Sequence, residues 1–121
     1  MKILRNRHVL AVKSVETSSR YFQDILGFTE TFAIGNDWRF LERDSCEVMM
    51  GECRDEVDAG ETGNHSYFAF WTVDDAAGLH EEWAAKGVEI CYPIRDEDWG
   101  WRAFGVRTPD GHRIMVGQQL G

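Results

Sequence analysis

The two halves of the chain repeat one succession of patterns, and this internal repeat constrains the fold more than any other feature. In each half a β-rich segment leads into a helix-like segment that ends at a glycine, Gly27 or Gly87, and three further β-rich segments follow. Residues 47–51 (EVMMG) correspond in pattern to residues 113–117 (RIMVG). Repetition at this spacing indicates a duplicated unit. We therefore predict an α+β fold of two tandem βαβββ modules, whose curled mixed sheets surround a concave pocket and carry the helices outside.

A chain of 121 residues is long enough to bury a sizeable core, so we expect a single domain. The first module is expected at about residues 1–51 and the second at about residues 65–121. The stretch between them, about residues 52–64, is rich in acidic residues and contains two glycines. That composition predicts an acidic loop that links the modules.

Periodicity and turn residues place the elements of each module. Ser14 is suited to cap the first helix and Asp74 the second, and Pro109-Asp110-Gly111 has the composition of a tight turn between antiparallel strands. The first strand is rich in Val and Leu without strict alternation, so we expect it to be buried on both faces. The predicted strands are residues 7–13, 28–34, 38–43 and 46–51 in the first module, and 67–73, 88–92, 102–107 and 112–116 in the second.

Charge and cysteine content narrow the class of partner. A formal net charge of −8 argues against nucleic acid, whose phosphates need a basic surface, and would attract a cationic ligand. No stretch approaches the length that crosses a membrane. The three cysteines lack the spacing of a zinc site, and reduced thiols are the simplest account of them. We therefore expect a cytoplasmic protein with no nucleic-acid and no membrane partner.

Short motifs in both halves carry a resemblance to a known family. The chain resembles the vicinal oxygen chelate superfamily, which includes glyoxalase I, extradiol dioxygenases, fosfomycin-resistance proteins and bleomycin-binding proteins. The resemblance covers essentially the whole chain and implies the same duplicated fold. The matching residues are Leu10-Ala11-Val12, Ser18 or Ser19, Tyr21-Phe22, Leu26-Gly27-Phe28, Trp99-Gly100, Arg102, Phe104 and Pro109-Asp110-Gly111-His112.

The resemblance also implies where a divalent metal would be held. Enzymes of the superfamily take ligands from the first and last strand of each module, at positions that hold Arg7, Met49, Phe68 and Met115 in this sequence. Arginine does not deprotonate to bind a cation, phenylalanine has no donor atom, and thioethers suit soft metals. We therefore expect no metal and no cofactor.

Nearby histidines leave one alternative for a metal open. His8 and His65 have the wrong parity for the pocket face, so only a β-bulge would bring them to a metal. His112 follows the turn and is expected at the surface or in the turn itself.

Alternation along the strands predicts that the pocket face is rich in aromatic and methionine side chains. Aromatic faces stack on planar rings and attract cations, and methionine adapts to irregular ligands. The same side chains would also suit simple filling of the space between the sheets. No catalytic constellation is recognisable. The predicted ligand-binding residues are Arg7, Trp38, Phe40, Glu42, Met49, Phe68, Phe70, Trp99, Trp101 and Met115.

The pattern is most similar to that of bleomycin-resistance proteins, which are acidic, rich in Trp, free of metal and similar in length. The resemblance implies a metal-free protein that binds an aromatic, cationic small molecule, sequesters a planar drug of the bleomycin type and thereby gives antibiotic resistance. It also implies a homodimer. The alternatives are a metal-dependent glyoxalase-like lyase or isomerase, an extradiol dioxygenase, and a ligand-sensing or purely structural dimer.

Overall fold

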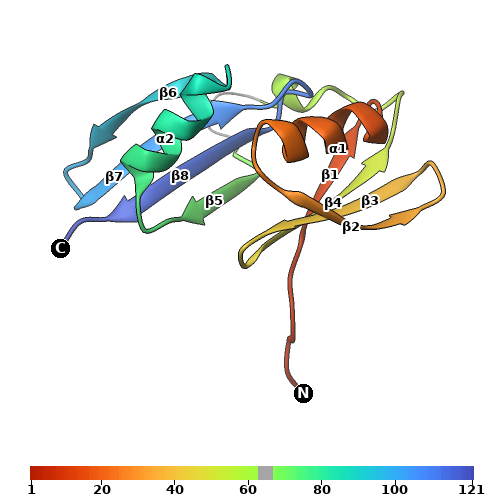
Figure 1. The fold of residues 1–121 in the computed structure, drawn as a ribbon, viewed down its shortest axis with the longest axis horizontal. Coiled ribbons are helices and arrows are strands. Elements are labelled where there is room, and N and C mark those ends of the chain that lie inside the picture. The colour runs from red at the N-terminus through yellow and green to blue at the C-terminus, as the bar shows by residue number, and fades with distance from the viewer. Residues whose placement is uncertain (63–66) are drawn as a thin grey trace. The chain divides into compact units, whose positions relative to one another are not determined.

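The computed structural model describes residues 1–62 and 67–121 and divides into two compact units, Met1–Val57 and Asp58–Gly121 (Figure 1). Each unit contains one α-helix and a four-stranded mixed sheet in the order βαβββ. The predicted α+β fold of two tandem modules is therefore confirmed. Within the described part of the chain no helix is long and apolar enough to cross a lipid bilayer.

In the first unit the sheet has the strand order β1-β4-β3-β2. Strand β1 runs parallel to β4, whereas the β2–β3 and β3–β4 pairs are antiparallel. The helix packs on β2, β3 and β4 and covers one face of the sheet (Figure 1). The elements are β1 (His8–Val12), α1 (Val15–Asp24), β2 (Thr29–Ile34), β3 (Trp38–Arg43) and β4 (Cys46–Glu52).

The second unit repeats this topology with the strand order β5-β8-β7-β6. Strand β5 is parallel to β8, and the other pairs are antiparallel. A short 3₁₀ helix, η1 (Ala59–Glu61), lies in the stretch that was expected to be only a loop. The remaining elements are β5 (Ala69–Thr72), α2 (Ala76–Ala85), β6 (Glu89–Asp96), β7 (Trp101–Arg107) and β8 (Arg113–Gln119).

Both helices begin at a side-chain cap. The hydroxyl of Ser14 accepts a hydrogen bond from the backbone N–H of Thr17 (3.3 Å), as predicted. In α2 the cap is Asp75, whose Oδ1 accepts from the N–H of Gly78 (2.9 Å), so the prediction of Asp74 is wrong by one residue. An aspartate cap bonds the N–H three residues ahead, and only position 75 has the right register with the helix.

Most of the buried apolar side chains in each unit lie on the face of the sheet beneath its helix. In β1, Leu10 is 4% exposed, whereas Val9 next to it is 60% exposed. The prediction that this strand is buried on both faces is wrong, because one helix covers one face only. In the second unit the corresponding core is formed by Trp83, Phe104, Val106, Ile114 and Val116.

Strand β6 extends four residues beyond its predicted end at residue 92, through Pro93 to Asp96. Proline lacks the N–H that a central strand needs, but β6 lies at the edge of its sheet. Register shifts between Ile90 and Tyr92, and again between Tyr92 and Arg95, accommodate it. A proline often indicates the end of a strand, but Pro93 lies within an edge strand and does not end it.

The turn between β7 and β8 is formed as predicted, but His112 is not at the surface. The N–H of Gly111, whose φ is +92°, donates to the carbonyl of Thr108 (2.8 Å). His112 is 2% exposed, and its ring meets the ring of Phe68 edge-on at 4.7 Å. Burial lowers the pKa of the His112 imidazole, so the neutral ring is favoured in the fold.

Candidate ligand-binding site

We call the face of each sheet that lies opposite its helix the open face. On the open face of the first unit, cross-strand neighbours bring together side chains that are far apart in sequence. Met49 in β4 lies between Val9 in β1 and Phe40 in β3, and Phe40 in turn is paired with Phe32 in β2. The rings of Phe32 and Phe40 meet edge-on at 5.8 Å. The result is an apolar row that crosses the whole sheet.

Trp38 lies against the backbone of this face because its cross-strand partner is a glycine. A Cβ placed on Gly51 would stand 3.0 Å from the Cη2 atom of the indole. The absence of that carbon leaves room for the ring to cover the strand. Gly51 is itself buried, although it lies on the open face. The side chain of Trp38 is therefore positioned by packing.

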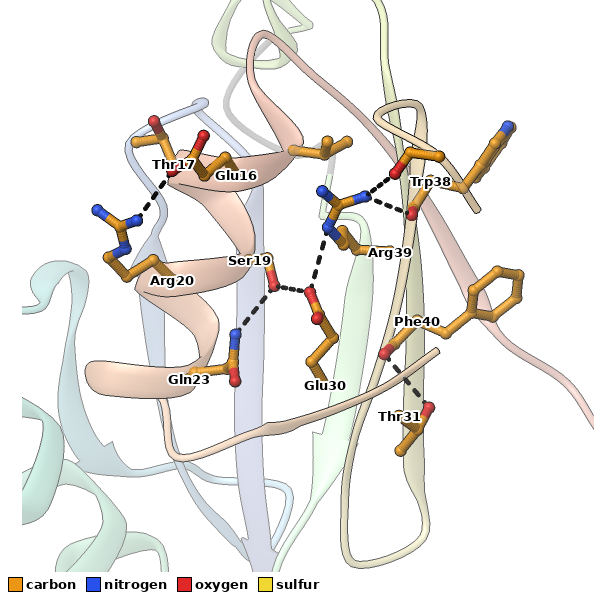
Figure 2. A network of polar contacts seen from close by, with 12 residues as sticks. Glu16, Thr17, Ser19, Arg20, Gln23, Glu30, Thr31, Trp38, Arg39 and Phe40 are labelled. Carbon is orange, nitrogen blue, oxygen red and sulfur yellow. Dashed lines mark hydrogen bonds and ion pairs between the residues drawn. The ribbon is translucent and has the colours of Figure 1, made fainter. Parts of the chain in front are cut away.

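A polar network on the opposite face holds the strand that carries Trp38 and Phe40 (Figure 2). Ser19 in α1 donates to Oε1 of Glu30 (2.8 Å), and Nε of Arg39 lies 3.3 Å from the same oxygen. Arg39 also donates to the carbonyls of Gly35 and Trp38, each at 2.9 Å. These contacts tie the β2–β3 hairpin to the helix and leave Trp38 and Phe40 pointing away from it, as Figure 2 shows.

One end of the same face is charged. The guanidinium carbon of Arg7 lies 5.6 Å from the centre of the Phe40 ring, and its Nη2 is 3.8 Å from Oε1 of Glu47. Nε of Arg5 approaches the same oxygen at 3.3 Å. Glu42 is the direct cross-strand partner of Glu47. An open hollow of about 350 Å³ lies between residues 4–6 and this acidic end of the β3–β4 hairpin.

The open face of the second unit carries a cluster of large rings. Phe70 is 47% exposed and meets Trp101 edge-on at 5.7 Å, while Trp99, 55% exposed, stacks on Trp101 at 5.8 Å. Met115 is the neighbour of Phe70 across the β5–β8 pair. A Cβ on Gly117 would lie 2.7 Å from Phe70 and 3.1 Å from Trp101. This unit therefore repeats the arrangement of rings over a glycine.

A carboxylate anchors the hairpin that presents the two tryptophans. Glu97 accepts hydrogen bonds at Oε1 from Nε of Arg95 (2.8 Å) and from the hydroxyl of Tyr92 (2.7 Å). The bond from Arg95 and then that from Tyr92 lower the pKa of the Glu97 carboxyl. The N–H of Glu97 donates to the carbonyl of Trp101 (2.7 Å), which closes the turn around Gly100. The stacked pair is thus held by a local network.

Comparison with known proteins places the chain in a family. The sequence model of the Glyoxalase/Bleomycin resistance protein/Dioxygenase superfamily matches residues 5–116. The chain belongs to this superfamily. No curated protein matches its sequence.

Among solved structures, the bleomycin-binding protein of bleomycin-producing Streptomyces verticillus, complexed with copper(II)-bleomycin, is 27% identical, with a TM-score of 0.73. The match covers 100% of this chain and 98% of that one. A superfamily member from Sphaerobacter thermophilus is 18% identical at a TM-score of 0.77, covering 98% of this chain and 99% of that one. Lactoylglutathione lyase from Agrobacterium tumefaciens is 13% identical at a TM-score of 0.71, covering 97% and 92%. The last two show the shared fold.

The four positions that the superfamily resemblance assigns to a metal do not fit a divalent ion. Met49 lies within the apolar row of the first unit, Met115 lies beside Phe70 in the second, and Arg7 already pairs with Glu47. Among the side chains that the structure describes, no three of His, Cys, Asp or Glu gather at one point. His8 pairs in regular register with buried Val48, so it faces the helix, and His65 lies outside the described residues.

The structure brings the ten predicted ligand-binding residues together as two groups, one in each unit. Arg7, Trp38, Phe40, Glu42 and Met49 share the first open face, and Phe68, Phe70, Trp99, Trp101 and Met115 belong to the second unit. Sequence reasoning missed the residues that support these groups. Strand alternation places Val9 on the same face as Arg7 and Glu47 on the same face as Met49, so the sequence could have indicated both residues. The residues missed are Val9, Phe32, Glu47 and Gly51 in the first unit and Tyr92, Arg95, Glu97 and Gly117 in the second.

Proposed function

We propose that this protein binds a planar, cationic small molecule of the bleomycin type and holds it without chemical change, as a drug-sequestering resistance protein does. The observation that carries the proposal is the pair of open faces on which rings that are exposed (Phe70) or half-buried (Trp38 and Trp101) are supported by glycines. The full-length similarity to a bleomycin-binding protein, at 27% identity, supports the same ligand class.

The chemistry of the two faces suits such a ligand. Aromatic rings stack on planar heterocycles and attract cations to their faces, and flexible thioethers fill the remaining irregular space. Met49 and Met115 each lie beside a ring that would meet the ligand. The net charge of −8 would speed the approach of a cation. We infer no catalytic step, because the metal positions of the superfamily carry Arg7, Met49, Phe68 and Met115.

Titration with bleomycin by isothermal calorimetry tests the proposal directly. We expect saturable binding both to the copper-free drug and to its copper(II) complex, with recovery of an unmodified drug by mass spectrometry. Affinity should fall as salt is raised, because the attraction between the drug and the acidic protein is screened. Absence of heat up to high micromolar drug, or recovery of an altered drug, would rule the proposal out.

We further propose that the protein acts as a homodimer. Val9, Phe32, Ile34, Phe70 and Trp99 leave large apolar side chains exposed, more than a monomer ordinarily presents. A twofold dimer would cover part of this surface and form two equivalent sites. Light scattering should therefore give twice the chain mass of 13.9 kDa. A mass of one chain across the micromolar range would contradict the dimer without bearing on the ligand class.

A further inference from the structure

The acidic end of the first open face already holds a cation, and that cation belongs to the chain. We propose that Arg7 occupies, as a tethered stand-in, the place that the cationic group of the ligand takes between Phe40 and the Glu42–Glu47 pair. Binding of the ligand then displaces Arg7. This inference rests on the proposed function and adds to it the position of the ligand's charge and an internal competitor for it.

The geometry of Arg7 is that of a bound guanidinium. Its charged carbon lies over the Phe40 ring at 5.6 Å, a distance at which a cation is attracted by an aromatic face. Its Nη2 lies 3.8 Å from the carboxylate of Glu47, which is within ion-pair range but too long for a hydrogen bond. A ring face combined with a carboxylate is a general means of binding a planar or quaternary cation. The position of the Arg7 side chain therefore indicates that this place accepts a cationic group of a ligand.

The carboxylates at this end are unevenly paired. Glu42 and Glu47 are direct cross-strand partners, and like charges in that position repel. Both Arg5 and Arg7 pair with Glu47. Among the ion pairs of the described residues, none includes Glu42, which is exposed beside the hollow. One carboxylate of the pair thus lacks the neutralising partner that an incoming cation would supply.

The contact that Arg7 makes is weak enough to exchange. Its side chain is 35% exposed, and a solvated ion pair of that length contributes little to stability. Residues 1–7 have no helix or strand, so the segment can leave the β3–β4 hairpin without breaking any strand pairing. The ligand must first displace Arg7. The apparent affinity for the ligand is therefore reduced to the extent that Arg7 occupies this place in the free protein.

The decisive comparison is between Arg7→Gln and Arg20→Gln. Arg20 lies in α1, pairs with Glu16 at 3.0 Å and is 66% exposed, so its replacement changes the net charge equally without touching the open face. We expect Arg7→Gln to bind ethidium and copper-free bleomycin about three- to tenfold more tightly than Arg20→Gln does, since an ion pair and a cation–π contact no longer compete.

A second readout follows the segment itself. In backbone amide relaxation, residues 3–7 should become mobile when the wild-type protein is saturated with either compound, and should be mobile already in Arg7→Gln. Equal or weaker binding by Arg7→Gln, or residues 3–7 that do not respond to a bound ligand, would overturn the inference and leave the proposed function standing. Failure of all three proteins to bind either compound would overturn both.

Discussion

Alanine in place of Trp101 is expected to lower the affinity for bleomycin-type drugs by about tenfold or more, as removal of a central aromatic anchor does. Trp101 stacks on Trp99 and meets Phe70 edge-on, so its loss removes one ring and leaves two others without support. Each aromatic pair contributes about 0.5–1.5 kcal/mol beyond its buried area. Calorimetric titration is the suitable measurement, because its signal does not depend on the tryptophan that is removed.

Phenylalanine substitutions provide the matched control. Trp101→Phe keeps a ring over Gly117, and we expect it to retain most of the affinity lost in Trp101→Ala. Trp71 lies on the helix-covered face of the same sheet, where it meets Trp83 edge-on at 6.4 Å. Trp71→Phe should therefore leave affinity unchanged. If Trp101→Ala bound as tightly as the wild type, the second open face would not be the ligand platform.

Trp83→Ala is expected to lower the free energy of unfolding by about 3–5 kcal/mol, the usual cost of deleting a buried tryptophan. Trp83 is 1% exposed and lies between the rings of Trp71 and Phe104. Urea denaturation gives the value. Trp99→Ala should cost only about 0.5–1.5 kcal/mol, because that side chain is 55% exposed and its removal loses mainly the stacking on Trp101. A loss at Trp83 no larger than that at Trp99 would contradict the described core.

Much of the fold was predictable because hydrophobic alternation and turn chemistry are local signals. Pro109-Asp110-Gly111 forms its turn, Ser14 caps its helix, and the repeated order of elements sets the topology. Two predictions that were wrong concerned burial, which depends on how the strands pack in the folded protein. Exposure of Val9 follows from which face the helix covers, and His112 is buried against the ring of Phe68, so neither property is encoded in the strand's own residues.

The candidate site likewise has features that the sequence could predict and features that it could not. Parity predicted that the rings of Trp38 and Phe40 share a face of the first sheet, because alternation is a property of any strand. The network of Glu97 with Tyr92 and Arg95 was not predictable, since two register shifts in β6 determine where those side chains meet. The pairing of Arg7 with Glu47 likewise depends on the parallel contact between β1 and β4.

Under the proposed function, the glycines beneath the rings would allow ligand selectivity to change without a change in the core. A methyl group on Gly117 would stand 2.7 Å from Phe70, and one on Gly51 would stand 3.0 Å from Trp38, so either ring would have to tilt outward. Under the proposed function, the depth available to a ligand would therefore be determined by two buried glycines that lie beneath the rings. Selectivity can drift through these two positions while the helix-covered faces, and the stability they provide, stay the same.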